Sequence, residues 1–335
     1  MKTILLPVTP PTANPPLTPP RRGTKDAGLS SWEGSGVGSG ARWASRFRGI
    51  LFFLVTAVLC GSVSARAADK KIVLVAGHPS HGPGDHEFNA GVQLLHKCLE
   101  HQPGVTSTFH LNGWPKDRHA FDSADTIMFF MDGGDGHPII QDDHLKIIGD
   151  LMKKGVGLVC VHYAVEVPKN KGGPEFLDWI GGYYETGFST NPHWEADFTS
   201  LPNHPITRGV KPFKIRDEWY YNIRFRPEMK GVTSVLVGKP DDETRQGKSS
   251  SPRGPYAHVV AASGHEEVLA WAVERPGGGR GFGFTGAHFH RNWGNENFRK
   301  IVLNAILWTA RVEVPASGVE CTVTDEDLKK NLDPK

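Results

Sequence analysis

The chain has 335 residues, enough for one large domain or two ordinary ones, and a core of that size needs neither disulfides nor a metal to fold. Its 38 basic and 36 acidic residues give a net charge of +2, but eight of the basic and only two of the acidic groups precede residue 68. Residues 68–335 therefore keep 30 basic against 34 acidic groups, a net charge of −4. This argues against a nucleic-acid partner, because phosphate binding requires a basic face.

The N-terminal part of the chain has the layout of an export signal behind a leader. Residues 1–45 are rich in Pro, Gly, Ser and Thr without a hydrophobic period, which predicts a disordered extension or a mis-assigned start. Residues 46–67 combine a basic start, an apolar run over 50–59 and small residues at Ala65 and Ala67, the pattern of a cleaved signal peptide. We expect a secreted or periplasmic protein with no stable membrane span after cleavage. An uncleaved anchor is the alternative.

The rest of the chain alternates strand-like and helix-like segments. Continuous apolar runs, typical of strands buried on both faces of a parallel sheet, lie at 70–78, 105–111, 125–134 and 156–162. Helical periodicity predicts helices at 87–100, 142–155 and 295–310, and the less regular second half contains strand-like segments at 193–198, 213–221, 233–238, 267–274 and 280–289. The alternation predicts one doubly wound α/β domain over 70–312, followed by a mostly polar tail, 313–335.

Of the four cysteines, Cys60 lies in the export signal. Three widely spaced cysteines remain, which suggests neither a disulfide framework nor a zinc knuckle. We expect Cys98 and Cys160 to pack as small buried hydrophobes, and Cys321 lies in the polar tail.

All 16 histidines follow residue 67, and several come directly after predicted strands. Ligands of open α/β sheets bind outside the carboxyl ends of the strands, so these histidines are expected to meet at one rim. Two carboxylates, Asp132 and Asp135, are expected at the same rim. The histidines concerned are His78, His81, His86, His137, His162, His288 and His290. A single histidine in such a place is more often structural, whereas several at corresponding strand ends favour a site.

His162 has the most specific position, because a buried strand runs straight into it. This resembles the strand-to-helix elbow at which α/β enzymes present a nucleophile. Cys160 should point into the sheet, so thiol chemistry is disfavoured. An imidazole at the elbow suits general base catalysis, metal ligation or a hydrogen bond to a sugar hydroxyl.

Two motifs in the second half could contribute to a sugar site. His204 precedes a proline, and Asp217-Glu218 adjoin Trp219 and Tyr220. Adjacent carboxylates in a strand point to opposite faces, so at most one of them faces a given pocket. Aromatic rings beside carboxylates suit a sugar, whose C–H face stacks while its hydroxyls bond to charged groups. A turn and a sheet-edge ion pair are the alternative interpretation.

The chain resembles the ThuA-like (trehalose utilisation) family from about Lys70 to Arg311. The motifs that carry this resemblance are, in order, KKIVLVAGH, GVGLVCVHYA, HPITRGVKPF, DEWYYN, TGAHFHRNW and NFRKIVLNAILWTA. The resemblance implies a flavodoxin-like, mainly parallel sheet with helices on both faces, related to the class I glutamine amidotransferases. His162 stands where those enzymes hold their catalytic cysteine, so amidotransferase activity is not expected. His78, His204 and Asp217-Glu218 match further positions of the family.

The resulting hypothesis is an exported carbohydrate-processing protein acting on a disaccharide, glycoside or keto-sugar as a hydrolase, lyase or isomerase. A non-catalytic sugar-binding module is the alternative. Assigned catalytic residues are His162, Asp217 and Glu218. Assigned sugar-binding residues are His78, His86, His204, Tyr220, His288 and His290. The sequence leaves the cofactor and the oligomeric state open. A divalent metal such as zinc would be held by His78, His162 and His288.

Overall fold

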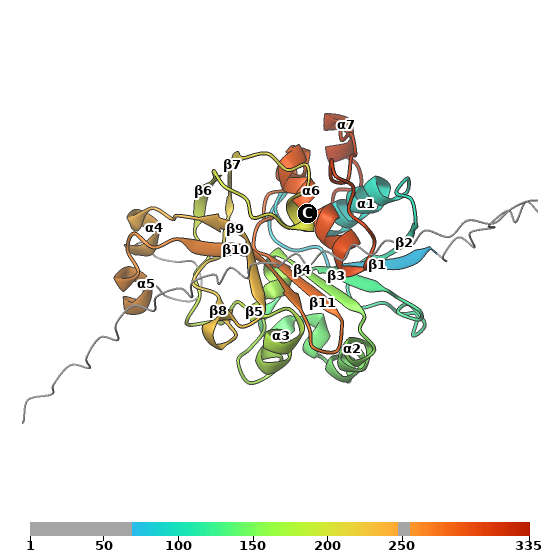
Figure 1. The fold of residues 1–335 in the computed structure, drawn as a ribbon, viewed down its shortest axis with the longest axis horizontal. Coiled ribbons are helices and arrows are strands. Elements are labelled where there is room, and N and C mark those ends of the chain that lie inside the picture. The colour runs from blue at the N-terminus through green and yellow to red at the C-terminus, as the bar shows by residue number, and fades with distance from the viewer. Residues whose placement is uncertain (1–68, 247–254) are drawn as a thin grey trace, which may run out of the picture. The chain divides into compact units, whose positions relative to one another are not determined.

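The structure is a computed structural model that describes residues 69–246 and 255–335 (Figure 1). The predicted extension, 1–45, and signal peptide, 46–67, lie outside the described residues. Among the described residues, no helix has the length and apolar character needed to span a membrane.

A seven-stranded sheet in the order β2-β1-β3-β4-β11-β10-β9 forms the centre of the fold (Figure 1). Strands β2, β1, β3, β4 and β11 run parallel, whereas β10 and β9 are antiparallel additions at one edge. The parallel part has the strand order of flavodoxin-like doubly wound folds, which confirms the predicted fold class. The bounds are β1 (Lys70–Ala76), β2 (Val105–His110), β3 (Thr126–Phe130), β4 (Gly157–Val161), β9 (Val232–Gly238), β10 (Glu267–Glu274) and β11 (Arg280–Phe284).

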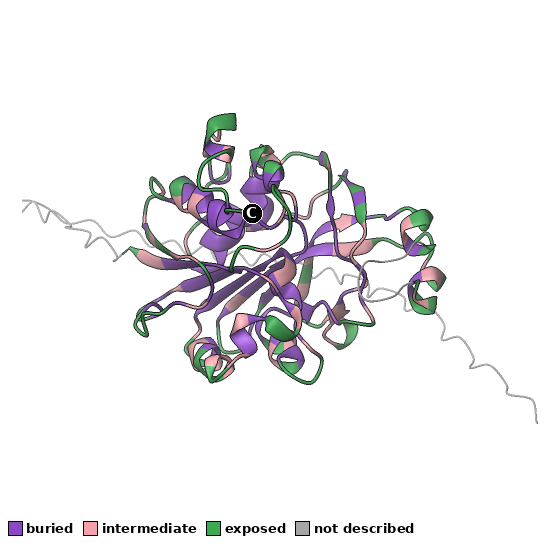
Figure 2. Cartoon of the chain, turned by 180° about the vertical axis from the view of Figure 1, so that it is seen from behind, coloured by how far each residue is buried: buried purple, intermediate pink, exposed green. Residues whose placement is uncertain are grey.

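Helices cover both faces of this sheet. On one face lie α1 (Phe88–Leu99) and α6 (Glu296–Thr309), and on the other lie α2 (His144–Lys153) and α3 (Gly173–Trp179) (Figure 1). Because successive side chains of a strand point to opposite faces, Leu74 packs with α1 and α6 whereas Val75 packs with α2 and α3. The central strands are consequently buried along their length (Figure 2).

Shorter elements complete the fold, and some of them supply parts of the site. Strands β6 (His193–Phe198) and β7 (Phe213–Glu218) form an antiparallel pair in which His193 lies opposite Glu218. The remaining elements are β5 (Gly182–Tyr183), β8 (Arg224–Phe225), α4 (Asp242–Gln246), α5 (Ala257–Ala261), α7 (Asp325–Leu328) and the 3₁₀ turns η1 (Gly134–Gly136), η2 (Pro138–Ile140), η3 (His162–Val165), η4 (Pro205–Thr207), η5 (Pro227–Met229) and η6 (His290–Gly294).

The polar tail is packed onto the domain and is linked to it by a disulfide. The expectation that none of the three cysteines forms a disulfide is therefore wrong for two of them. Cys98 of α1 forms a disulfide with Cys321, 223 residues later, while Cys160 is a buried free thiol as predicted. Pairing at that separation depends on the tertiary fold, so cysteine spacing carried no signal for it. Further along the tail, Lys335 Nζ lies 3.3 Å from Glu87 Oε1, at the start of α1.

We predict that Cys321→Ser lowers the free energy of unfolding by roughly 2–5 kcal/mol, because the open chain regains conformational freedom in its unfolded state. Denaturant titration of the variant and the wild type measures the difference. A reducing agent should lower wild-type stability by a similar amount and leave the variant unchanged. Equal stability of the two proteins under oxidising conditions would contradict this prediction.

Candidate functional site

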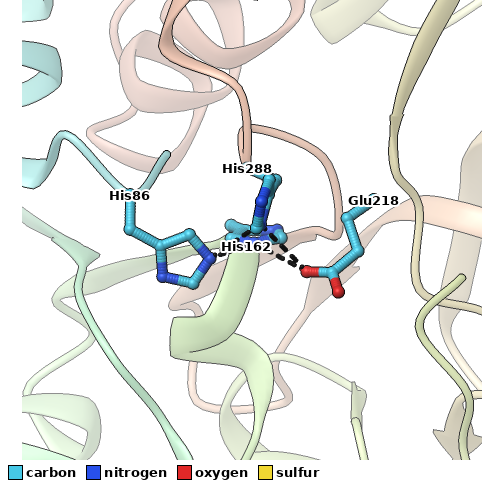
Figure 3. A group of neighbouring side chains, drawn as sticks. All are labelled: His86, His162, Glu218 and His288. Carbon is cyan, nitrogen blue, oxygen red and sulfur yellow. Dashed lines mark hydrogen bonds and ion pairs between the residues drawn. The ribbon is translucent and has the colours of Figure 1, made fainter. Parts of the chain in front are cut away.

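Four buried side chains meet at the carboxyl ends of the parallel strands. They are His86 after β1, His162 after β4, His288 after β11 and Glu218 at the end of β7. We call this set the histidine cluster. Figure 3 shows the four side chains pointing toward one another from separate segments. One nitrogen or oxygen atom from each lies within 4.8 Å of all the others. The predicted meeting of strand-end histidines at one rim is thus confirmed for three histidines.

His162 occupies the predicted elbow and is fully buried. Its backbone has a φ of 57°, in the left-handed region that non-glycine residues rarely adopt, and it begins η3. Its Nδ1 donates a hydrogen bond of 2.8 Å to the carbonyl oxygen of Thr285, directly after β11. In a neutral ring with a donating Nδ1, the accepting nitrogen is Nε2, and Nε2 points into the cluster.

His86 is oriented in the same way. Its Nδ1 lies 3.1 Å from Asp132 Oδ1, and its Nε2 lies 3.0 Å from His162 Nε2 and 2.9 Å from His288 Nδ1. Burial, followed by the neighbouring histidines, holds the pKa of His86 far below its usual value. His86 is therefore neutral at physiological pH. Its φ of 46° is a second left-handed backbone position among the cluster residues.

His288 completes the imidazole set and has a different electrostatic environment. Its Nδ1 lies 3.1 Å from Glu218 Oε2, and its Nε2 lies 3.6 Å from Asp85 Oδ2. Burial alone would lower its pKa, but the hydrogen bond and charge of Glu218 outweigh burial, and the pKa of His288 is raised. Burial would likewise raise the pKa of Glu218, yet its contacts with His162 and His288 hold that pKa well below the usual range.

Asp217 and Glu218 point to opposite faces, as strand geometry predicts. The Asp217 carboxylate accepts hydrogen bonds from the backbone N–H groups of Ala287 and His288, at 2.9 and 3.0 Å, and from Asn292 Nδ2 at 2.8 Å. Ala287 has a φ of 91°, so these bonds hold a left-handed turn beside His288. Asp217 therefore supports the loop of the cluster, and Glu218 alone faces the cluster.

The donor atoms fit a divalent metal ion. Three imidazole nitrogens and one carboxylate oxygen are ligands that zinc prefers, and neighbouring ligands in a tetrahedral zinc site lie roughly 3.3 Å apart. Four edges of the cluster measure 2.9, 3.0, 3.1 and 3.5 Å. Thr285, Asp132 and Asp85 contact the outer ring nitrogens, as carbonyls and carboxylates do for metal-bound histidines.

The cluster opens into a cavity of about 560 Å³, a size suited to a small-molecule ligand. Tyr220 belongs to it as predicted: its hydroxyl lies 3.2 Å from His162 Nε2, and burial raises the pKa of that hydroxyl. The lining residues are His81, His86, Tyr163, Glu166, Asn191, Pro192, His193, Glu218, Tyr220 and His288.

Three predicted site residues lie elsewhere, which corrects their assignment. His78 is exposed, with its ring against Gly113, and His86 rather than His78 lies in the histidine cluster. His204 caps η4 and packs on Trp308, near the amino end of β11. It therefore lies at the opposite ends of the parallel strands from the histidine cluster. His290 is buried beside Glu87 and the tail, where burial lowers its pKa.

Sequence reasoning did not assign several cavity residues. His193 Nε2 lies 3.7 Å from Glu218 Oε1, and its position opposite Glu218 follows from the β6–β7 register, which the sequence does not give. Glu166 and Tyr163 follow the His162 elbow in sequence, which was the available signal for both. Asn191 donates a 3.0 Å hydrogen bond to Glu218 Oε1 from a segment without regular structure.

Comparisons with known proteins concern the sequence and the fold of the chain. The sequence model of the ThuA family, described as trehalose utilisation, matches residues 72–309. A ThuA-like protein of Parabacteroides merdae is 16% identical, with 77% of this chain and 94% of that chain covered and a TM-score of 0.50, which shows a shared fold. A ThuA-like protein of Bacteroides uniformis is also 16% identical, with 74% and 91% covered and a TM-score of 0.47. No curated protein matches the sequence.

We predict that Asp217→Asn and Glu218→Gln have different consequences. Asp217→Asn places an amide against backbone N–H donors and should cost roughly 2–4 kcal/mol of stability, because buried donors lose a charged acceptor. Glu218→Gln keeps its shape in the cavity and should change the melting temperature little, while lowering the pKa of His288. Thermal melting and histidine NMR titration of both variants measure these effects. A stable Asp217→Asn protein would remove its supporting role.

Proposed function

The chain belongs to the ThuA family, and from this premise we propose that it is an exported, divalent-metal-dependent enzyme that processes a small carbohydrate. The observation that carries the proposal is the histidine cluster, in which one potential ligand atom from each of three imidazoles and one carboxylate converge at the edge of a cavity. His86 Nε2 lies 2.9 Å from His288 Nδ1 and 3.0 Å from His162 Nε2, and a divalent cation would take the place of the hydrogens between these atoms.

His86, His162, His288 and Glu218 would hold the metal. A divalent metal in such a site polarises a substrate oxygen or lowers the pKa of a bound water. The chain's own residues orient the ligands: Thr285 fixes the tautomer of His162, and Asp132 contacts the Nδ1 of His86. Tyr220 places a neutral hydroxyl beside the cluster, where it can donate a hydrogen bond to a substrate oxygen.

The cavity supports a sugar as the substrate class. Its wall combines the rings of Tyr163 and Tyr220 with the polar groups of Glu166, Asn191 and His193. A pyranose offers a C–H face to aromatic rings and several hydroxyls to polar groups, which matches this lining. The description of the family as trehalose utilisation agrees with that substrate class.

Export is the second half of the proposal. Residues 46–67 have the layout of a signal peptide, and the Cys98–Cys321 disulfide gives independent support. Disulfides persist in oxidising compartments such as the periplasm and the extracellular space, and they are rare in the cytosol. A cleaved signal and an oxidised pair of cysteines are consistent with one location.

We predict that the purified domain binds a divalent metal in stoichiometric amount, and that His162→Asn abolishes this binding while the fold persists. Asparagine tolerates the left-handed backbone at this position, so the elbow should keep its shape. Elemental analysis measures the metal and thermal melting measures the fold. His78→Asn is the control, because His78 is exposed and lies outside the cluster.

Loss of the metal should also sharply reduce turnover of the sugar substrate, because the substrate oxygen or the attacking water would no longer be activated by the cation. A metal-free wild type with an intact His162→Asn fold would contradict the metal proposal. Sugar binding without turnover in the metal-loaded protein would instead favour the non-catalytic sugar-binding module. A His162→Asn protein that fails to fold would make this histidine structural.

We also predict that the mature protein begins near Ala67 or Ala68, because the apolar run and the small residues define one cleavage region. N-terminal sequencing of protein from the periplasm or medium measures this start. A mature start within residues 1–45, or retention of all the protein in the cytosol, would contradict export.

A further inference from the structure

Glu166 is a buried carboxyl group in the cavity that neither the histidine cluster nor the domain core uses. Only 6% of the residue is exposed, and its side chain lines the cavity together with Glu218 and His288. It follows η3, four residues after His162, so it lies beside the rigid elbow without being a metal ligand.

The position of Glu166 is fixed by its backbone and by one hydroxyl. Its N–H donates to the carbonyl of Tyr163 and its carbonyl accepts from Gly134 N–H, both at 3.0 Å. The Thr186 hydroxyl donates a 2.5 Å hydrogen bond to Oε1. An isolated β-bridge pairs the backbone of Glu166 with that of Tyr184 and further restrains it. The carboxyl group is therefore held in place, as a group that acts on substrate needs to be.

The charges around Glu166 differ from those around Glu218. Glu218 contacts two histidines, whereas the charged groups that act on Glu166 are the carboxylates Glu218 and Asp135. The histidines of the same cavity, His81, His86, His193 and His288, make no ion pair with Glu166 among the described residues. Burial, opposed by the Thr186 hydrogen bond and reinforced by the nearby carboxylates, raises the pKa of Glu166 to about 7. A buried carboxyl group with a pKa near neutrality can both take up and return a proton at physiological pH.

We propose that Glu166 is the proton-transfer residue of this site, exchanging a proton with a hydroxyl group of the sugar bound beside the histidine cluster. The inference rests on the proposed function for the sugar and adds a catalytic residue to it. In the forward step the O–H bond of the substrate breaks, its electron pair stays on the sugar oxygen, and the proton converts the Glu166 carboxylate into a carboxylic acid. Return of that proton to the product oxygen restores the carboxylate.

The test compares wild type, Glu166→Gln, Glu166→Asp and the control Glu195→Gln, all as metal-loaded full-length mature protein. Glu195 is an exposed residue of β6 paired with Lys214, outside the cavity. Each protein is assayed for metal content, melting temperature and turnover of trehalose, maltose, cellobiose and their 3-keto forms. The carboxyl groups of wild type and Glu166→Gln are titrated by ¹³C NMR with labelled glutamate.

We expect Glu166→Gln to keep its metal and its fold and to lose about 10²–10⁴-fold in turnover, since an amide cannot accept the proton. Glu166→Asp should recover part of that loss, and Glu195→Gln should behave as wild type. The wild-type rate should rise with pH as Glu166 loses its proton, and that limb should be absent in Glu166→Gln. One glutamate titrating well above the usual range should disappear from the Glu166→Gln spectrum.

Glu166→Gln turnover within a few-fold of wild type would overturn the inference while leaving the metal and sugar proposals intact. A Glu166 resonance that titrates like an exposed glutamate would overturn it as well, whether or not a sugar of the panel is converted. A wild type that holds no metal or converts no sugar would contradict the proposed function, and the NMR titration then decides the Glu166 inference separately.

Discussion

The hydrogen bond from His162 Nδ1 to the carbonyl of Thr285 is the interaction on which the site depends. It joins the carboxyl ends of the adjacent parallel strands β4 and β11, which the sheet already holds in register. The bond holds the ring so that Nε2 faces His86, and in the neutral ring Nε2 is then the accepting nitrogen. The cluster is thus built outward from one backbone carbonyl. The neighbouring rings are oriented in the same manner, by carboxylates that contact their outer nitrogens.

Such a cluster costs stability, and the surrounding fold offsets the cost. Residues in the left-handed backbone region cost about 1–3 kcal/mol each, and they persist where surrounding contacts determine the local structure. His86, His162 and Ala287 all adopt this region. The sheet supports the first turn of η3, Asp217 supports the loop of Ala287, and the disulfide-linked tail packs against the start of α1, directly after His86. Left-handed backbone and buried polar side chains thus occur together at this rim.

The two glutamates of the cavity illustrate how the environment assigns different roles to identical side chains. Glu218 lies among imidazoles and is held in its charged form, which suits a ligand for a cation. Glu166 has nearby carboxylates in place of contacting imidazoles, and its burial favours the protonated form. His162 after β4 and His288 after β11 contact Glu218, whereas Asp135 of η1 acts on Glu166. The environment of each glutamate therefore cannot be derived from its immediate neighbours in the chain.

The sequence alone determined the α/β class, the parallel strands and the elbow at His162, because these follow from local apolar runs and the residues that end them. It also determined that only one of Asp217 and Glu218 could face the cavity, because strand periodicity is local. The tertiary structure decided which strand-end histidine joins the cluster: His86 lies inside and His78 outside, although both follow β1. It also decided the Cys98–Cys321 disulfide and the placement of His193. Those outcomes depend on pairing between segments far apart in the chain, and residue spacing contains no information on which distant segments the folded sheet brings together.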